Sequence, residues 1–336
     1  MKLIIQIPCF NEETTLPMTL RSLPRRIAGI EQIEVLVIND GSTDGTARRA
    51  RELGVDHVVE FARNQGLGAA FRAGLDACLK LGADIIVNTD ADNQYFGEDI
   101  EVLVQPILKH QADLVVGTRD IDSIEYFSAT KKCLQKLGSW IVRKASGCPL
   151  ADTTSGFRAF NREAALRTIV HSKFSYTLET LIQAGTGPLS IMQVPVRVNG
   201  KLRESRLAGS TWQYLKRSGA NVLRVYSMYN PLKVFFVLGS ASFLAGFALG
   251  LRYLYYYFLE GSSGHVQSLI LSAILLILGF QILVIGLVAD LIAANRRLNE
   301  EVLYRLRKME LSGNTHSEDL QSQKSLEAAR SGHSWH

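Results

Sequence analysis

The C-terminal third of the chain contains two long segments without a charged residue, 234–251 and 268–289. About 20 consecutive apolar residues are enough to span the hydrocarbon core of a bilayer, and helices buried in soluble proteins seldom lack charge for that distance. The pattern predicts two transmembrane helices, at about 234–258 and 267–290, joined by the polar turn 261–264. Two core helices of a large soluble domain are the alternative interpretation.

Basic residues cluster at the outer ends of this predicted hairpin, whereas its connecting loop carries few charges. The flanking residues are Arg217, Arg224 and Lys233 before the first span and Arg296, Arg297, Arg305, Arg307 and Lys308 after the second. Because lysine and arginine concentrate on the cytoplasmic side of a membrane, we expect both termini and the N-terminal domain in the cytoplasm. The chain is thus predicted to be an integral membrane protein in contact with membrane lipids.

The N-terminal part alternates apolar runs with segments of helical spacing. The predicted strands are 2–7, 33–39, 55–61, 85–89 and 114–118, and the predicted helices are 14–23, 44–53 and 68–81. Continuous apolar strands that alternate with amphipathic helices are typical of an α/β fold with a mostly parallel sheet. In such sheets ligands bind beyond the carboxyl ends of the strands, so the loops that follow the strands are the candidate binding loops.

Asp90 and Asp92 directly follow the strand-like run 83–87. Two carboxylates at this spacing can hold one Mg²⁺ or Mn²⁺ and leave coordination positions for phosphate oxygens. Gln94 is a candidate third oxygen ligand. An acidic turn after a strand is the alternative interpretation, because aspartate is a common turn former.

Three further loops after predicted strands carry polar or glycine-rich residues, at 8–13, 40–45 and 63–68. Asp40 is a candidate acceptor for a base N–H or a ribose hydroxyl, and Gly41 allows the chain to turn closely beneath a ligand. The Gly-x-Gly at 66–68 opens neither a dinucleotide fingerprint nor a Walker loop. Phe71 stands where the former needs glycine or alanine, and no Gly-Lys-Ser/Thr follows.

Composition narrows the class of partner. The net charge of +5 is modest, and the basic residues gather around the membrane end. This pattern favours anionic lipid or phosphate, and no nucleic-acid binding is expected because no basic stripe with interleaved aromatic residues is present. The four cysteines lack any Cys-x-x-Cys spacing, and we interpret them as reduced and structural.

Six short strings follow one another through the N-terminal part of the chain: Ile7-Pro-Cys-Phe-Asn-Glu12, Val37-Ile-Asn-Asp-Gly-Ser-Thr-Asp-Gly-Thr46, Asn64-Gln-Gly-Leu-Gly68, Thr89-Asp-Ala-Asp-Asn-Gln94, Val116-Gly-Thr-Arg119 and Asp152-Thr-Thr-Ser-Gly-Phe-Arg158. As an ordered set they resemble the motifs of the family 2 inverting glycosyltransferases with a GT-A fold. More narrowly, they resemble the polyprenyl-phosphate (dolichyl-phosphate) glycosyltransferases, many of which carry a C-terminal two-helix membrane anchor.

The resemblance implies a role for each matching position. Binding of the nucleotide-sugar donor is implied for Pro8, Phe10, Asn11, Glu12, Asp40, Gly41, Arg63, Gly68 and Asp90, and metal binding for Asp90, Asp92 and Gln94. Catalytic roles are implied for Asp92, Asp152 and Arg119. Binding of the acceptor phosphate is implied for Arg119, Arg203, Ser205 and Arg206. Asp152 keeps two interpretations, a base or orienting residue at the acceptor phosphate and a structural partner of Arg158.

The reaction implied is the metal-dependent, inverting transfer of one sugar from a nucleotide-sugar donor to a polyprenyl or dolichyl monophosphate, with Mg²⁺ or Mn²⁺ as the ion. The chain lacks the Gln-x-x-Arg-Trp signature of processive synthases, which favours a single transfer. A UDP-hexose or UDP-N-acetylhexosamine donor is favoured, and GDP-mannose is the alternative. Two competing functions are transfer to a hydroxyl-bearing lipid, with Asp152 as base, and nucleotide-sugar binding without turnover.

The expected organisation has five parts: a GT-A domain at 1–210, a juxtamembrane amphipathic helix at 211–232, two transmembrane helices within 233–292, a cytoplasmic helix at 293–311 and a disordered tail at 312–336. The segment 121–147 reads either as a basic amphipathic helix on the membrane or as ordinary packing against the domain. Homo-oligomerisation through the helical hairpin is expected.

Overall fold

The computed structural model describes residues 1–119, 152–172, 176–199, 229–260 and 266–331, together with the isolated positions 143, 224, 226 and 227, and it describes side chains as far as Ser312. The chain divides into two compact units. The first unit comprises residues 1–219 and 300–336, and the second comprises residues 220–299.

A seven-stranded sheet forms the centre of the first unit. Its strands are β1 Lys2–Cys9, β2 Gln32–Asn39, β3 His57–Glu60, β4 Ile85–Asn88, β5 Leu114–Thr118, β6 Arg158–Asn161 and β7 Ile191–Pro195. Their order across the sheet is β3-β2-β1-β4-β6-β5-β7. Only β6 runs antiparallel to its neighbours among these strands. The predicted α/β fold with a mostly parallel sheet is confirmed.

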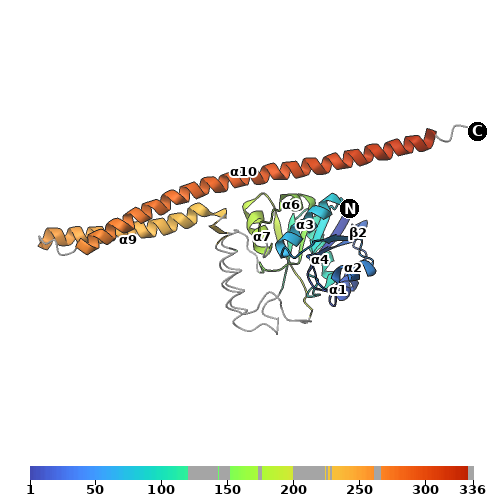
Figure 1. Cartoon of the computed structure of the whole chain (residues 1–336), viewed down its shortest axis with the longest axis horizontal. Helices are drawn as coiled ribbons and strands as arrows, with labels where there is room; N and C mark the ends of the chain where they lie inside the picture. Colours follow the sequence, from blue (N-terminus) through green and yellow to red (C-terminus); the bar gives the residue numbers. More distant parts are fainter. Residues whose placement is uncertain are drawn as a thin grey trace, which may run out of the picture. The chain divides into compact units, whose positions relative to one another are not determined.

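Helices cover both faces of the sheet (Figure 1). They are α1 Leu16–Ser22, α2 Thr46–Glu52, α3 Leu67–Lys80, α4 Ile100–Leu108 after the short 3₁₀ helix η1 Gly97–Asp99, α6 Arg162–Arg167 and α7 Thr177–Thr186. Because side chains alternate along a strand, Leu3, Ile5 and Ile7 of β1 face one hydrophobic core with α1 and α4. Ile4 faces the other core, which α3, α6 and α7 complete.

Strand register brings the loops with polar residues to one edge of the sheet. Cys9 at the end of β1 pairs with Asn39 at the end of β2. Asn88 at the end of β4 pairs with Arg158 at the start of the antiparallel β6, so the residues after Asn88 run beside those before Arg158. At the end of β5, the Thr118 carbonyl accepts a hydrogen bond of 3.0 Å from the Val196 N–H.

Residues 300–311 of helix α10 (Val266–Ser331), which follow its apolar part, belong to the first unit. Tyr304 and Leu311 are buried in the hydrophobic core that α3 and α6 help to form. The Tyr304 hydroxyl donates to Glu163 Oε2 at 3.0 Å, and Arg307 lies 3.3 Å from Asp76 Oδ1. The backbone of α10 is helical through Ser331 and so extends into 312–336, the segment predicted to be a disordered tail. The boundaries of the five predicted parts stay predictions.

The second unit contains helix α9 (Pro231–Glu260) and the first part of α10. Segments Pro231–Leu259 and Val266–Ser312 each contain an 18-residue stretch, with mean hydropathy of 2.1 and 2.7 respectively, and are long and apolar enough to cross a membrane. Small residues bring the two helices together: a Cβ atom on Gly246 would lie 2.9 Å from the Leu276 nitrogen, and the Ser272 hydroxyl donates to the Gly246 carbonyl at 2.6 Å. Homo-oligomerisation through this hairpin stays a prediction.

Several predicted features lie outside the described residues. They are the amphipathic segment 121–147 apart from residue 143, most of the juxtamembrane helix 211–232, the turn 261–264, and the candidate acceptor-phosphate residues Arg203, Ser205 and Arg206.

Candidate active site

Asp90 and Asp92 lie in the loop after β4, at the edge of the sheet where the other polar loops meet. The Asp92 Oδ1 atom accepts a hydrogen bond of 3.1 Å from the Gln94 N–H. Asn93 adopts the left-handed backbone conformation with φ of 54°, which asparagine tolerates better than most residues. The loop is therefore a tight acidic turn, and this turn presents two carboxylates at the end of the strand.

The Asp90 carboxylate lies against the backbone of Gly156. A Cβ atom built on Gly156 would lie 2.9 Å from Asp90 Oδ2, so any larger residue here would displace the carboxylate. Burial and the neighbouring negative charges of Asp92 and Glu12 raise the pKa of Asp90 to about 7, although Arg119 acts in the opposite direction. Three carboxylates, Asp90, Asp92 and Glu12, are thus opposed by two arginines, Arg119 and Arg158, and burial adds to the cost of the remaining charge.

This charge surplus fits a divalent cation. Within the described part of the chain, no three or more His, Cys, Asp or Glu side chains are grouped to enclose a metal ion. Two aspartates supply hard oxygen ligands and leave positions for water or phosphate oxygens, as is usual for Mg²⁺ in phosphate chemistry. The residues present therefore fit an ion that is shared with a phosphorylated ligand better than a closed structural site.

Arg119 follows β5 and forms a bidentate ion pair with Asp152. Its Nε donates to Asp152 Oδ2 at 2.7 Å and its Nη2 donates to Oδ1 at 3.3 Å, while Nη2 also donates to the Thr154 hydroxyl at 3.0 Å. Both side chains are almost completely buried, with exposed fractions of 8% and 0%. Burial alone would raise the pKa of Asp152, but Arg119 and Thr154 outweigh it and hold that pKa below its usual range.

Arg158 has different partners from those predicted. Its Nε donates to the Ser155 carbonyl at 2.9 Å and its Nη2 to the Thr153 carbonyl at 3.2 Å, and Nη1 donates to the Thr180 hydroxyl. Burial lowers the pKa of Arg158 to about 10. Asp152 accepts hydrogen bonds from Arg119 and Thr154, because β5 and β6 are neighbours and bring Arg119 to Asp152, while the charge of Asp152 still acts on Arg158.

The loops after β1, β2 and β3 interlock. Asp40 is buried, and its carboxylate accepts hydrogen bonds from the Gln65 N–H at 2.7 Å and the Gly66 N–H at 3.0 Å. Gly41 has a φ of +66°, and a Cβ atom there would lie 2.3 Å from the Arg63 carbonyl carbon. Asp40 and Gly41 therefore hold the glycine-rich loop 63–68 against the end of β2.

Comparison with known proteins gives a family. A family model described as Glycosyl transferase family 2 matches residues 4–168, and one described as GtrB C-terminal hairpin matches residues 230–294. The undecaprenyl-phosphate mannosyltransferase of Micrococcus luteus is 31% identical over 221 residues, which cover 62% of this chain and 88% of that protein. The chain belongs to glycosyl transferase family 2.

Two further comparisons bear on this membership. The UDP-N-acetylglucosamine–dolichyl-phosphate N-acetylglucosaminyltransferase of Methanococcus voltae is 29% identical over 57% of this chain and 83% of that protein. Glucosyl-3-phosphoglycerate synthase of Mycobacterium tuberculosis, in its crystal structure with Mn²⁺, UDP and phosphoglyceric acid, has a TM-score of 0.52 and 23% identity over 67% of this chain and 78% of that chain. This second likeness shows the fold, and the predicted GT-A architecture of a family 2 enzyme is confirmed.

The predicted donor-binding residues of this family 2 enzyme differ in their exposure to solvent. Phe10 is 39% exposed just beyond β1, and Arg63 is also exposed, whereas Pro8 is buried within β1. Glu12 is buried and accepts a hydrogen bond of 2.6 Å from the Thr15 hydroxyl. Gly68 packs against protein, since a Cβ atom there would lie 1.9 Å from the Ser172 carbonyl oxygen. Their contacts with a donor stay predictions.

Asn11 joins two of the loops of the family 2 domain. It adopts the left-handed conformation with φ of 56°. Its N–H donates to the Ser42 hydroxyl at 2.9 Å, and its Oδ1 accepts from the Thr43 N–H at 2.8 Å. The Asn11 side chain therefore holds the loop after β2 in place, next to the exposed ring of Phe10.

Several residues beneath the acidic turn escape the motif analysis. They are Gln6, Asn88, Tyr95 and Tyr176, all in contact with the loops that carry the site aspartates. A signal for two of them exists in the sequence, since Gln6 and Asn88 are polar residues inside or at the end of otherwise apolar strands. Buried polar residues of this kind need partners, and here they find one another.

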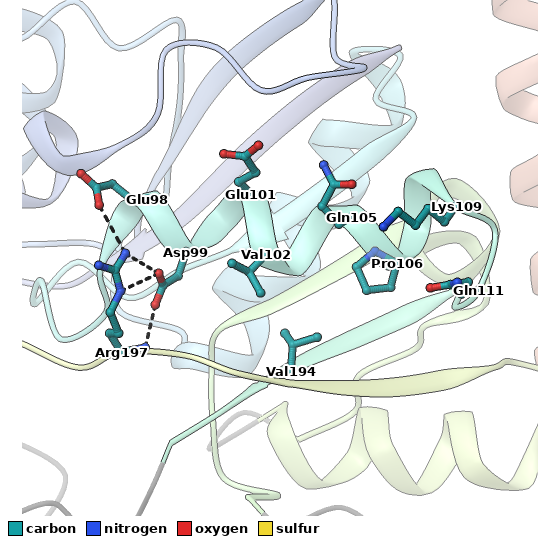
Figure 2. Close-up of a pocket in the computed structure, with 10 residues that line it drawn as sticks. All are labelled: Glu98, Asp99, Glu101, Val102, Gln105, Pro106, Lys109, Gln111, Val194 and Arg197. Atoms are coloured by element: carbon teal, nitrogen blue, oxygen red, sulfur yellow. Dashed lines mark hydrogen bonds and ion pairs between the residues drawn. The ribbon is translucent and has the colours of Figure 1, made fainter.

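A separate groove of about 660 Å³ lies between α4 and the edge strand β7 (Figure 2). Val102 and Val194 form its apolar part, while Glu98, Asp99 and Arg197 gather at one end. Arg197 donates to Asp99 Oδ1 from Nε at 2.9 Å and from Nη2 at 2.6 Å. None of the predicted family 2 site residues lines this groove.

Proposed function

We propose that this chain transfers one sugar, with inversion, from a nucleotide-sugar donor to a polyprenyl or dolichyl monophosphate at the cytoplasmic face of a membrane. The observation that carries the proposal is that Arg119, held by buried Asp152, lies at the same sheet edge as Asp90 and Asp92. Relatives named for undecaprenyl phosphate and dolichyl phosphate support the choice of acceptor. The match to a C-terminal hairpin supports a membrane-anchored enzyme.

A phosphate acceptor reduces the chemical demand on the protein. A lipid monophosphate is mostly ionised near neutral pH, because its second pKa is about 6, so its oxygen needs no general base to attack. In a single displacement this oxygen bonds to the anomeric carbon while the bond from that carbon to the donor diphosphate breaks, which inverts the configuration. The task of the protein is to orient the two phosphates and to neutralise their charge.

Arg119 suits this task because its guanidinium is already fixed. Asp152 engages Nε and Nη2, and Thr154 also accepts from Nη2, so the plane of the guanidinium is set before any ligand binds. An arginine held in this way presents its charge to a phosphate without further ordering. We assign it to the acceptor phosphate or to the departing diphosphate.

Asp90 and Asp92 would hold Mg²⁺ or Mn²⁺, with Gln94 as a third candidate. The ion, when bound, would offset the charge that develops on the departing nucleoside diphosphate. The excess negative charge around Asp90 and the tight turn at Asp92 support this assignment.

The chain after β7 leads from the acidic turn toward the predicted acceptor residues. The Asn199 N–H donates to the Gln94 carbonyl at 2.8 Å, and its side-chain amide donates to the Asn93 carbonyl at 2.9 Å. Arg206 lies seven residues further on, and a chain of that length reaches at most about 25 Å. This length permits a role for Arg203, Ser205 and Arg206 at the acceptor phosphate, which we propose from the sequence.

The competing acceptor, a lipid hydroxyl, would need a general base. Asp152 is the predicted candidate, yet its carboxylate is buried, accepts four hydrogen bonds from Arg119 and Thr154, and has a lowered pKa. A carboxylate stabilised in its ionised form is a weak proton acceptor. This observation favours a phosphate acceptor.

The test is transfer of radiolabel from UDP-glucose, UDP-N-acetylglucosamine, UDP-galactose or GDP-mannose into an organic-extractable polyprenyl-phosphate product. We expect label from one donor, lost on adding EDTA and absent with Asp92→Asn. Label that reaches a lipid hydroxyl instead would replace the proposed acceptor. Donor binding without any lipid-phase label would leave a binding protein without turnover.

A further inference from the structure

A chain of buried polar side chains lies directly beneath the Asp90 carboxylate. Gln6 in β1, Asn88 at the end of β4 and Tyr176 just before α7 are all fully buried. Gln6 Nε2 donates to Asn88 Oδ1 at 2.9 Å, and Asn88 Nδ2 donates to the Tyr176 hydroxyl at 2.7 Å. Residues from three separate parts of the sequence thus meet at one point below the acidic turn.

The chain ends on the peptide that touches Asp90. The Gly156 carbonyl accepts two hydrogen bonds, at 2.9 Å from Asn88 Nδ2 and at 3.1 Å from the Tyr176 hydroxyl. On its other side, the Gly156 N–H donates to the Tyr95 hydroxyl at 3.3 Å. The backbone N–H and the backbone carbonyl of Gly156 are therefore both held by side chains. This leaves the backbone at Gly156 little freedom to shift.

The position of Gly156 in turn limits the position of Asp90. A Cβ atom on Gly156 would lie 2.7 Å from the Tyr176 hydroxyl oxygen and 2.9 Å and 3.1 Å from the two Asp90 carboxylate oxygens. The glycine is thus in van der Waals contact with the hydroxyl on one hand and with the carboxylate on the other. A shift of this peptide by a few tenths of an ångström would change the space that the carboxylate occupies.

The ring of Tyr176 is itself fixed by packing. It stacks on Phe71 of α3, with ring centroids 3.9 Å apart and parallel planes. Removal of the hydroxyl alone would leave this stacking in place, so the function of the oxygen can be tested without dismantling the core.

We propose that Tyr176 is a positioning residue for Asp90: its hydroxyl, together with Asn88, sets the Gly156 peptide against the carboxylate and so fixes the direction in which Asp90 faces a divalent cation. The inference rests on the proposed function, in that it takes Asp90 as part of a metal site. It adds to that site a residue that is not among the proposed metal ligands and that lies 86 residues after Asp90 in the sequence.

The test is Mn²⁺ binding to the full-length, detergent-solubilised protein, measured by electron paramagnetic resonance of free Mn²⁺ with UDP and, separately, with GDP. Partners outside the ligand shell typically change metal affinity by about 10-fold to 100-fold when removed. We therefore expect Tyr176→Phe to bind Mn²⁺ at least about tenfold more weakly than wild type. The kcat of label transfer should also fall. The far-ultraviolet circular dichroism spectrum should be like that of wild type.

The matched control is Tyr304→Phe. Tyr304 is also a buried tyrosine, and its hydroxyl, like that of Tyr176, donates one hydrogen bond and accepts one: it donates to Glu163 at 3.0 Å and accepts from Lys308 Nζ at 3.2 Å. The two variants remove the same atom, so a general loss of stability would affect both in the same way. We expect Tyr304→Phe to bind Mn²⁺ within about twofold of wild type, since Tyr304 touches no residue of the acidic turn.

A second variant tests the contacts of Gly156. Gly156→Ala keeps the Tyr176 and Asn88 side chains but places a methyl group against both the Tyr176 hydroxyl and the Asp90 carboxylate, and we expect it to weaken Mn²⁺ binding as well. Wild-type affinity in both Tyr176→Phe and Gly156→Ala, or an equal loss in Tyr304→Phe, would overturn the positioning role while leaving the proposed function intact. Failure of the wild-type protein to bind Mn²⁺ with either nucleotide would overturn the proposed metal site and the inference with it.

Discussion

At the scale of single residues, the Arg119–Asp152 pair sets the orientation of the guanidinium that we assign to a phosphate. Both members are buried, and the two hydrogen bonds between them fix the guanidinium. A buried ion pair is costly to break, because removing one partner leaves an uncompensated charge in a region with little water. The two interpretations of Asp152, as a base and as an orienting residue, therefore differ in a measurable way.

We expect Asp152→Asn to slow lipid-linked sugar formation by about 100-fold, because a small displacement of Arg119 misplaces the phosphate that it binds. The free energy of unfolding of the first unit should fall by about 3 kcal/mol. If Asp152 acts through Arg119, the double variant with Arg119→Met should be no slower than Arg119→Met alone, as a double-mutant cycle of initial rates will measure.

The control for this variant is Asp113→Asn. Asp113 precedes β5 at the end opposite to Arg119, and its carboxylate accepts from the Ser190 N–H at 2.8 Å and from Asn161 Nδ2 at 2.7 Å. It should lower stability without changing the transfer rate of the folded protein. Additive losses in the cycle of Asp152→Asn and Arg119→Met would instead assign Asp152 a role of its own, such as a base.

Asp90 gives a pH dependence at the same scale. Its pKa of about 7 means that below pH 7 the carboxyl carries a proton that a cation must displace, whereas above pH 7 the charged carboxylate is ready to bind. Between pH 6 and pH 8 the ionised fraction rises by about tenfold, and the affinity for Mn²⁺ should rise with it. Titrations with Mn²⁺ alone avoid protonation of the nucleotide, and an affinity that does not change with pH would contradict the expectation.

At the scale of elements, the packing of α9 on α10 depends on glycine. A Cβ atom on Gly279 would lie 2.6 Å from the Phe243 nitrogen, and Gly246 faces Leu276 in the same way. Overpacking of a close contact costs about 1–3 kcal/mol. Close approach of two helix backbones through small residues is a common basis of helix association in membranes, because the hydrophobic effect does not favour contact between helices that are already surrounded by lipid.

Gly246→Leu should therefore lower the temperature at which half of the detergent-solubilised protein is lost from the monodisperse peak in size-exclusion chromatography. Ala245→Leu is the matched control, because Ala245 is the adjacent residue on α9 and is exposed. Equal behaviour of the two variants would show that the hairpin tolerates a bulky side chain at the contact between the helices.

Elements also show what the sequence could predict. The strands β1, β2, β4 and β5 consist mostly of apolar residues, which is why their positions could be predicted. By contrast, β6 is four residues long and begins with Arg158, whose strand conformation depends on antiparallel pairing with β4 and β5. Since that pairing also brings Asp152 to Arg119, the partner of Asp152 could not be predicted from spacing along the chain.

At the scale of the whole molecule, the order of the units constrains topology. The chain leaves the first unit after residue 219, passes through residues 220–299 and returns to the first unit at residue 300. Because the inserted unit holds two helices able to span a membrane, its two ends must emerge on the same side if both of them cross. The basic residues beyond those ends favour the cytoplasmic side.

We expect a membrane-impermeant maleimide to label Ser263→Cys in intact cells, because residue 263 lies in the loop between the two candidate spans. Ser312→Cys, beyond the second span, should be labelled only after the membrane is permeabilised. Of the four native cysteines, Cys9 and Cys78 are buried, and Cys133 and Cys148 are replaced by serine in the starting protein so that they add no background. Labelling of Ser312→Cys in intact cells would reverse the orientation and place the proposed transfer on the opposite face, whereas equal labelling of both positions without permeabilisation would mean that the helices do not cross.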